Sequence, residues 1–273
     1  MILLKNVYHL ATMNDAGDRL SGVDVLIDGN VIAEIGADLD PGGSAAARED
    51  PRTDDRGGPS VTERGRHTSR GPGESGGSAS RSEPRVIDCS SMVALPGLVN
   101  LHHHFYQTLQ RNVPPAQNRK LFDWLTTLYD IWAGLTLNAV RASTRLACAE
   151  LLLTGCTMSS DHMYVFPQAE KGDLIGTQVE AARELGIRFH PTRGSMSLGR
   201  DQGGLPPGSV VQSEEEILAD SERVIDEHHD PAPFSMVRVA LAPCSPFSVT
   251  DALMEETAAL ARTKGVLLPT HVA

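Results

Sequence analysis

The sequence has few aromatic residues, few cysteines and no long hydrophobic run. Phe, Trp and Tyr make up 4% of its 273 residues. No apolar run approaches the ~20 residues that a membrane-spanning helix needs, so we expect no membrane segment. The cysteines are scattered and form no CxxC pair: Cys89, Cys148, Cys156 and Cys244. This scatter is typical of reduced thiols and favours a cytoplasmic protein over one cross-linked by disulfides.

Basic residues are also fewer than acidic residues. There are 24 Lys and Arg residues against 35 Asp and Glu residues, a formal net charge of −11. An acidic surface repels phosphate backbones, so we expect no nucleic-acid partner and favour a small-molecule substrate. The N-terminus, MILLKNVYHLATMND, has no charged segment before its apolar residues and no small-residue cleavage site after them. It therefore predicts a strand, not a signal peptide.

Residues 42–85 almost completely lack large apolar side chains, with Val61 as the one large aliphatic residue and no aromatic residue. Such a segment cannot bury enough apolar surface to offset its chain entropy, and we predict that it is disordered. A linker between two domains is one interpretation. We favour an insertion within a small β-domain of residues 1–95, because β-like runs lie on both sides: VLIDGNVIAEIG, which predicts a hairpin, and VIDCSSMVALPG.

Residues 96–273 alternate short apolar runs with longer helical patterns. The expected strands are 97–102, 156–161, 187–190, 237–242 and 266–271. The expected helices are 121–133, 138–153, 173–185, one opened by a capping box at 213–216 and one starting at 248–251. This alternation predicts an α/β fold with a parallel sheet covered by helices. An open doubly wound sheet and a (β/α)8 barrel both fit, and no GxGxxG or P-loop favours the former.

Three consecutive histidines follow the first of these strands. Side chains alternate along a strand, so His102 and His104 should point to one side and His103 to the other. Two neutral imidazoles on one side can hold Zn, Fe, Ni or Cu. For an isolated HxH pair, a polar turn with one packed histidine is the competing interpretation.

The last expected strand also ends in a histidine, His271. In a parallel barrel the carboxyl ends of all strands lie at one face, where active sites are built. The three side chains would converge there. We therefore predict a site for one divalent metal with His102, His104 and His271 as ligands.

Longer motifs carry a resemblance to a known family. PGLVNLHHH after a small β-domain, with a histidine ending a later strand, resembles the amidohydrolase superfamily of metal-dependent hydrolases. Other segments resemble its 8-oxoguanine deaminase branch, with triazine hydrolases as near relatives: LHHHFYQTLQR, LFDWLTTLYDIW, ACAELLLTGCTMSSDHMYVFP, RFHPTRGSMSLG, GGLPPGSVVQ and LAPCSPFSVT. The resemblance covers residues 1–41 and 86–273.

The resemblance implies a partial (β/α)8 barrel over residues 96–273, with about five of the family's strands, beside a small β-sandwich. It implies one divalent metal, with zinc favoured and iron as the alternative. The implied reaction is hydrolytic deamination of an oxidised purine, 8-oxoguanine to urate and ammonia, by a metal-bound hydroxide. Hydrolysis of an s-triazine of the hydroxyatrazine type is the alternative. Relatives also imply a homo-oligomer when the protein is full length.

The family's ligands are HxH on strand one, a His on strand five and an Asp on strand eight, and the first three match the histidines above. The family's catalytic Glu, three residues after the strand-five His, would fall beyond Ala273, as would the strand-six His and the strand-eight Asp. We therefore expect no catalytic acid or base within this chain, and an inactive fragment is a third hypothesis. Asp161 is the one obvious carboxylate at the same face, and we expect it to hydrogen-bond a neighbour instead.

Three residues are candidate substrate contacts. The resemblance implies that Gln107 hydrogen-bonds the purine edge, and Arg193 is a candidate for a carbonyl oxygen of the ring. Cys244 is a candidate for the pocket wall. The competing interpretations are a loop glutamine facing water, a surface salt bridge and a buried structural thiol. We expect His162 and Tyr164 to pack, with a place over the substrate as the alternative.

Overall fold

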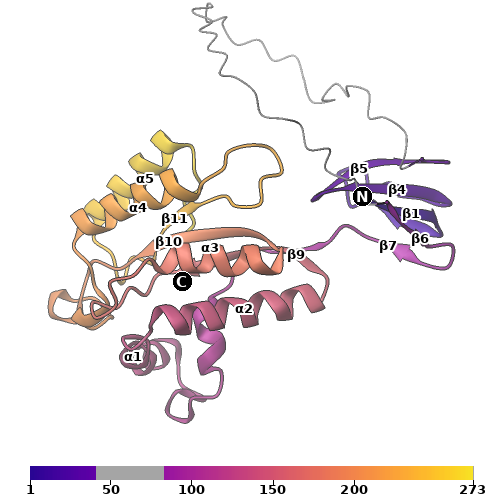
Figure 1. Ribbon diagram of the computed structural model, residues 1–273. Coiled ribbons are helices and arrows are strands. Elements are labelled where there is room, and N and C mark those ends of the chain that lie inside the picture. Colours follow the sequence, from indigo (N-terminus) through magenta and orange to yellow (C-terminus); the bar gives the residue numbers. More distant parts are fainter. Residues whose placement is uncertain (41–82, 273) are drawn as a thin grey trace, which may run out of the picture. The chain divides into compact units, whose positions relative to one another are not determined.

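The computed structural model describes residues 1–40 and 83–272 and divides the chain into two units, Met1–Pro96 and Gly97–Ala273 (Figure 1). The disordered insertion predicted at 42–85 lies outside the described residues, apart from its last three positions. No helix among the described residues is long and apolar enough to cross a membrane.

The N-terminal unit is built from two small sheets around a shared core. The first has the order β5-β4-β1-β6, formed by Val31–Gly36, Val23–Asp28, Ile2–Val7 and Arg85–Asp88. The second has the order β3-β2-β7, formed by Arg19–Leu20, His9–Ala11 and Val93–Ala94. β4 and β5 pair antiparallel, which confirms the predicted hairpin, and Gly29 takes the positive φ of 58° that its turn requires. The buried core residues are Val7, Leu10, Val25 and Cys89.

The C-terminal unit is a curled parallel sheet covered by helices. Its strands are β8 (Leu98–Asn100), β9 (Cys156–Met163), β10 (Arg188–Ser195) and β11 (Ala240–Pro243). Its α-helices are α1 (Leu121–Trp132), α2 (Leu137–Leu153), α3 (Leu174–Leu185), α4 (Glu214–His228) and α5 (Asp251–Lys264) (Figure 1). Short 3-10 helices cover Phe105–Gln110, Pro114–Ala116, Arg200–Gln202 and Gly208–Val210.

The strand order identifies the architecture. The strands pair as β11-β10-β9-β8, so each new strand adds beside the one before it, and all neighbours are parallel. A doubly wound sheet reverses this order at its switch point, whereas a (β/α)8 barrel does not. The unit is therefore a partial (β/α)8 barrel, which confirms the predicted α/β fold class.

The helices begin and end where local chemistry allows it. The Asp173 carboxylate accepts a hydrogen bond from the Gly176 amide at the start of α3. The capping box predicted at the start of α4 is present, with the Ser213 hydroxyl and the Glu216 carboxylate exchanging bonds with each other's backbone amides. Gly186 ends α3 with a positive φ of 76°, which glycine adopts at little cost.

Several expected strands differ in extent from the observed ones, and β10 runs to Ser195, well past the expected end at residue 190. β11 begins at Ala240 rather than at residue 237, because the Val239 amide donates to the His229 ring instead of to a neighbouring strand. Residues 266–271 form no strand: they make one isolated bridge, Leu267 with Ala240. Pro269 has no N–H to continue a ladder, which accounts for the interruption.

Candidate metal centre

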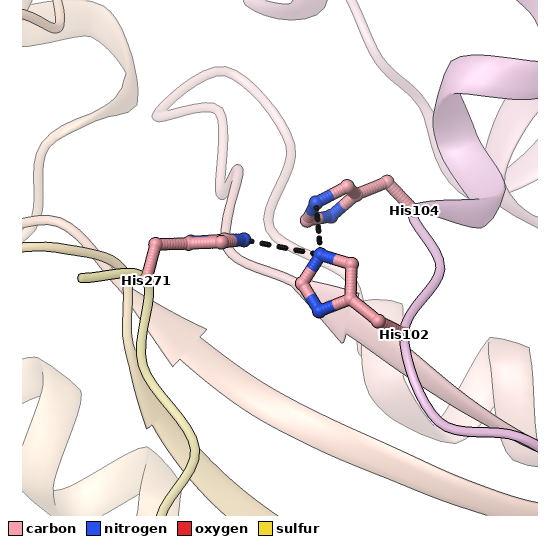
Figure 2. Close-up of side chains that lie close together, drawn as sticks. All are labelled: His102, His104 and His271. Atoms are coloured by element: carbon pink, nitrogen blue, oxygen red, sulfur yellow. Dashed lines mark hydrogen bonds between the residues drawn. The ribbon is translucent and has the colours of Figure 1, made fainter. Parts of the chain in front are cut away.

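Three histidine rings converge at the carboxyl end of the parallel sheet (Figure 2). His102 and His104 lie in the segment that follows β8, and His271 lies beyond the bridge at Leu267. The Nε2 atom of His102 is 3.2 Å from Nε2 of His104 and 3.3 Å from Nε2 of His271. The structure therefore brings together all three predicted ligands.

Two main-chain carbonyls fix which nitrogen of each ring faces the centre. Nδ1 of His104 is 2.7 Å from the carbonyl oxygen of His162, and Nδ1 of His271 is 2.8 Å from that of Cys244. A carbonyl oxygen only accepts, so both Nδ1 atoms carry the proton and donate it. Their Nε2 atoms are then left with lone pairs facing the shared point, as in metal-bound histidines.

The spacing of the Nε2 atoms fits a single small cation. A tetrahedral ion with Zn–N bonds of about 2.05 Å has ligand atoms about 3.3 Å apart, and the two measured separations are 3.2 and 3.3 Å. Without a cation, one proton on the His102 Nε2 atom would have to form hydrogen bonds with the lone pairs of both other Nε2 atoms, those of His104 and His271. The donor set therefore fits a divalent metal such as zinc.

Burial keeps the rings of His104 and His271 neutral, which is the form that binds metal. It lowers the pKa of His104 to about 3. Burial also lowers the pKa of His271. Both imidazoles consequently have their lone pairs available throughout the physiological pH range.

β9 anchors the segment that carries the HxH pair. The Asp161 carboxylate accepts hydrogen bonds from the Phe105 amide and from the Gln178 side chain, each at 2.6 Å. The His162 amide donates to the His103 carbonyl oxygen at 2.7 Å. Asp161 therefore hydrogen-bonds its neighbours, as predicted, and is no part of the group of Nε2 atoms. His103 packs against the Phe105 ring, with its ring outside that group.

A cavity of about 370 Å³ opens beside the histidines. His104, His271, Gln107 and Cys244 contribute to its wall. The rest of the wall is mainly apolar or aromatic: Leu121, Phe122, Trp124, Leu125, Tyr129, Tyr164, Leu205, Phe247 and Val272, with Ser245. A space of this size with a few polar groups at one end is typical of a small-molecule site. No Asp or Glu lines it among the described residues.

Gln107 and Cys244 line the cavity beside His104 and His271. The Gln107 amide nitrogen is 3.4 Å from the hydroxyl of buried Tyr106. The Cys244 thiol is 5% exposed and lies 4.0 Å from Nδ1 of His271. Burial raises the pKa of this thiol to about 11, so it is a neutral wall group and not a nucleophile.

Arg193 is not brought to the histidines, which corrects its expected substrate role. Its side chain has no exposed surface and donates to Asp220 on α4 at 2.8 Å and to Gln212 at 2.9 Å. In the parallel register, Thr192 lies beside His162 and Arg193 beside Met163. His162 faces the histidine group, so Arg193 points to the opposite, helix-covered face.

A second group of possible metal-binding side chains lies at α3 and α4, formed by Asp173, Glu227 and His228. The Arg223 guanidinium already binds Asp173 at 3.2 Å and Glu227 at 2.6 Å. Because this cation supplies the positive charge, we interpret the group as a salt-bridge network between two helices.

The aromatic side chains that cover the histidine rings were not assigned to the centre from the sequence. His162 and Tyr164 pack, as expected, but they pack on the metal-binding rings themselves: His162 stacks on His271, and Tyr164 lies edge-on to His104. The sequence signal was SDHMY at the end of β9, where alternation places His162 and Tyr164, two residues apart, on one face.

Comparison with known proteins agrees with this geometry. The model of the family described as Amidohydrolase family matches residues 93–273. The 8-oxoguanine deaminase of Pseudomonas aeruginosa is 52% identical over 68% of this chain and 41% of its own length. The hydroxydechloroatrazine ethylaminohydrolase of Pseudomonas sp. (strain ADP) is 34% identical over 99% of this chain and 50% of its own length.

Solved structures give the same result. The atrazine chlorohydrolase TrzN of Arthrobacter aurescens TC1, complexed with zinc, superposes with a TM-score of 0.78 at 31% identity, covering 99% of this chain and 52% of that one. The chain spans about half the length, or less, of the curated relatives named above. The matched segment includes all three histidines and most of the described barrel, and this chain belongs to the amidohydrolase family.

Proposed function

We propose that the histidine centre serves the hydrolytic deamination of an oxidised purine, converting 8-oxoguanine and water to urate and ammonia. The observation that carries this proposal is the convergence of three Nε2 atoms beside a cavity of substrate size. The 52% identity to an 8-oxoguanine deaminase supports the substrate class.

Four residues of the site have a task in the proposed reaction. His102, His104 and His271 would hold the divalent ion, which would supply Lewis acidity that makes water nucleophilic near neutral pH. Gln107 offers an amide oxygen and an N–H to the edge of the ring, a pattern that pairs with an amidine-like group. Water adds to the ring carbon that bears the amino group, the C–N bond breaks, and the amino group leaves as ammonia.

The remaining assignments belong to the same proposal. We take zinc as the metal, supported by the three imidazole donors and by zinc in a related structure, with iron as the alternative. A homo-oligomer and a cytoplasmic location are also proposed; the four free cysteines favour a reducing compartment. The general acid and base are proposed to be the Glu and His that the family places after position 273.

Hydrolysis of an s-triazine is the second candidate function. A relative named as a hydroxydechloroatrazine ethylaminohydrolase aligns with 99% of this chain. The cavity wall also favours a substrate with an alkyl group, because its lining includes the apolar side chains of Leu121, Phe122 and Phe247.

Substrate turnover with a matched control tests these alternatives. Zinc-loaded samples of this chain, and of a version extended past position 273 to include the proposed Glu and His, are incubated with 8-oxoguanine or with an N-alkylamino hydroxytriazine, and the released ammonia or alkylamine is measured. We expect the extended version to release ammonia and urate from 8-oxoguanine, and to lose this turnover in His104→Ala but not in His190→Ala, whose histidine lies outside the site. Alkylamine release alone would favour the second candidate. Stoichiometric zinc with no turnover of either substrate by the extended version would overturn both candidates, and turnover by the 273-residue chain alone would show that the assignment of the acid and base is wrong.

A further inference from the structure

The ring of His162 lies flat against one of the metal ligands. Its centroid is 4.3 Å from that of His271, and the two planes differ by 3°. His162 is 3% exposed, and its Nε2 atom is 3.3 Å from the carbonyl oxygen of Ala242 on β11. The ring is therefore held between two strands, with its face covering the His271 ring.

The side chain of His162 is not itself part of the ligand group. Its ring centroid is 5.9 Å from that of His102 and 5.6 Å from that of His104. Its Nε2 atom points toward a carbonyl oxygen and not toward the point where the three ligand atoms meet. A role for His162 must therefore act through the ligands.

The main chain of His162 orients His104 and the HxH segment. Its carbonyl oxygen accepts the Nδ1 proton of His104 at 2.7 Å, and its amide donates to the His103 carbonyl oxygen at 2.7 Å. One residue of β9 thus contacts both the HxH segment and His271, which is distant in sequence.

We infer that His162 is a positioning residue of the metal centre, whose flat ring sets the plane of His271 while its carbonyl sets the tautomer of His104. A planar, uncharged ring suits this task, because it restricts rotation of the stacked imidazole without placing a charge beside the cation. Partners that orient metal ligands typically change metal affinity 10–100-fold when they are lost. The inference rests on the metal site of the proposed function, but not on its substrate.

Metal binding by the whole chain tests the inference without using catalysis. Zinc affinity is measured by competition with a chromogenic chelator, and the ligand geometry is followed by the visible absorption of bound cobalt(II). We expect His162→Ala to weaken zinc binding about 10–100-fold and to shift the cobalt bands. His162→Phe keeps a flat ring and should bind within about threefold of the original. His190→Ala is the matched control, a histidine on the neighbouring strand β10 outside the ligand group.

The alternatives give different results. If His162→Ala binds zinc within threefold of the original, the inference is wrong. If His162→Phe loses as much affinity as His162→Ala, a ring nitrogen matters and stacking does not. His162→Leu has a bulky side chain without a flat ring. If its zinc affinity equals that of His162→Phe, the stacking role is overturned. This variant also replaces His162→Ala in the test if the alanine variant fails to fold. Weakened zinc binding in His162→Ala, together with no ammonia release from the version extended past position 273, would support this inference while refuting the proposed deaminase.

Discussion

Asp161 is a fully buried carboxylate whose two hydrogen-bond partners, the Phe105 amide and the Gln178 side chain, are both neutral. Burial raises its pKa from the ordinary 3.8 to about 7. Between these two values the folded protein holds a proton that the unfolded chain has released. The stability that this proton contributes is complete below pH 4 and is lost as the pH rises through 7.

We expect Asp161→Asn to remove this pH dependence. The unpartnered Oε1 atom of Gln178 can accept a bond from the new amide after a flip of the Gln178 side chain. The two proteins should have similar free energies of unfolding at pH 4. At pH 8 the variant should be more stable by a few kcal/mol, because a tenfold change in a proton-binding constant corresponds to about 1.4 kcal/mol. Urea unfolding between pH 4 and pH 8 measures this difference, and parallel curves for the two proteins would contradict it.

Individual site residues were predictable where spacing alone decides their place. For His102 and His104, the HxH pattern after a strand left a polar turn as the competing interpretation, and His271 at the end of a later expected strand decided for a metal site. Arg193 was misplaced because the sequence predicted a strand ending at residue 190, whereas β10 continues to Ser195. Within a strand, the face of a side chain depends on register with the neighbouring strand, and one sequence does not fix register.

At the scale of elements, β9 and β10 approach each other closely at Gly194. A Cβ atom at this position would lie 2.4 Å from the Met163 carbonyl oxygen and 2.7 Å from the Tyr164 Cα atom, both main-chain atoms of the adjacent strand region. Main chain cannot rotate away as a side chain can, so the strands would have to move apart.

We predict that Gly194→Ala destabilises the protein by about 1–3 kcal/mol. It should also weaken zinc binding, because Tyr164 packs against His104 and His271. Gly208→Ala is the control, since a Cβ atom there meets nothing within 4 Å. Thermal unfolding and zinc titration of both variants measure the effects. Equal unfolding temperatures for the two variants would show that the close approach is not a constraint.

Helices were easier to predict than strand ends for a physical reason. A helix is terminated by its own residues, such as the Asp173 cap and Gly186 at the two ends of α3. A strand ends where its partner stops offering hydrogen bonds. The Val239 amide is taken by a histidine ring from the end of α4, and Pro269 offers no amide at all. The first of these interruptions needs knowledge of a distant residue.

At the scale of the whole molecule, β8 and β11 are the two edges of the barrel sheet among the described residues. Large apolar side chains near these edges are more than half exposed: Leu98 60%, Val99 53%, Leu101 76%, Leu267 66% and Val272 79%. Exposed edges with apolar side chains favour association with other chains.

We therefore expect the 273-residue chain to associate as its concentration rises and to bind an apolar dye such as ANS. Sedimentation at several concentrations and dye fluorescence are the measurements. Charged substitutions at Leu101 and Leu267 should reduce both signals, whereas the same change at exposed Met13, on the N-terminal unit, should not. A dye-free monomer at every concentration would contradict the expectation.

Removal of the metal should loosen the last described segment first. His271 and the Leu267 bridge tie residues 266–272 to the sheet beside β11, and His271 is one of the three metal-binding histidines. We predict that chelation lowers the unfolding temperature and speeds amide hydrogen exchange at Leu241 and His271 more than in α2. Uniform exchange with and without the chelator would argue against this.

The three ligands are unevenly distributed along the chain, with His102 and His104 two residues apart and His271 169 positions from His102. A bound ion therefore closes a very long loop, as a removable disulfide would. Closing a loop of that length lowers the conformational entropy of the unfolded chain. By the chain-entropy relation used for disulfides, this stabilises the folded state by about 5 kcal/mol. A metal bound to these three histidines would therefore stabilise the folded chain. Where the metal is scarce, the chain would unfold and be degraded more readily, so metal supply would set its lifetime.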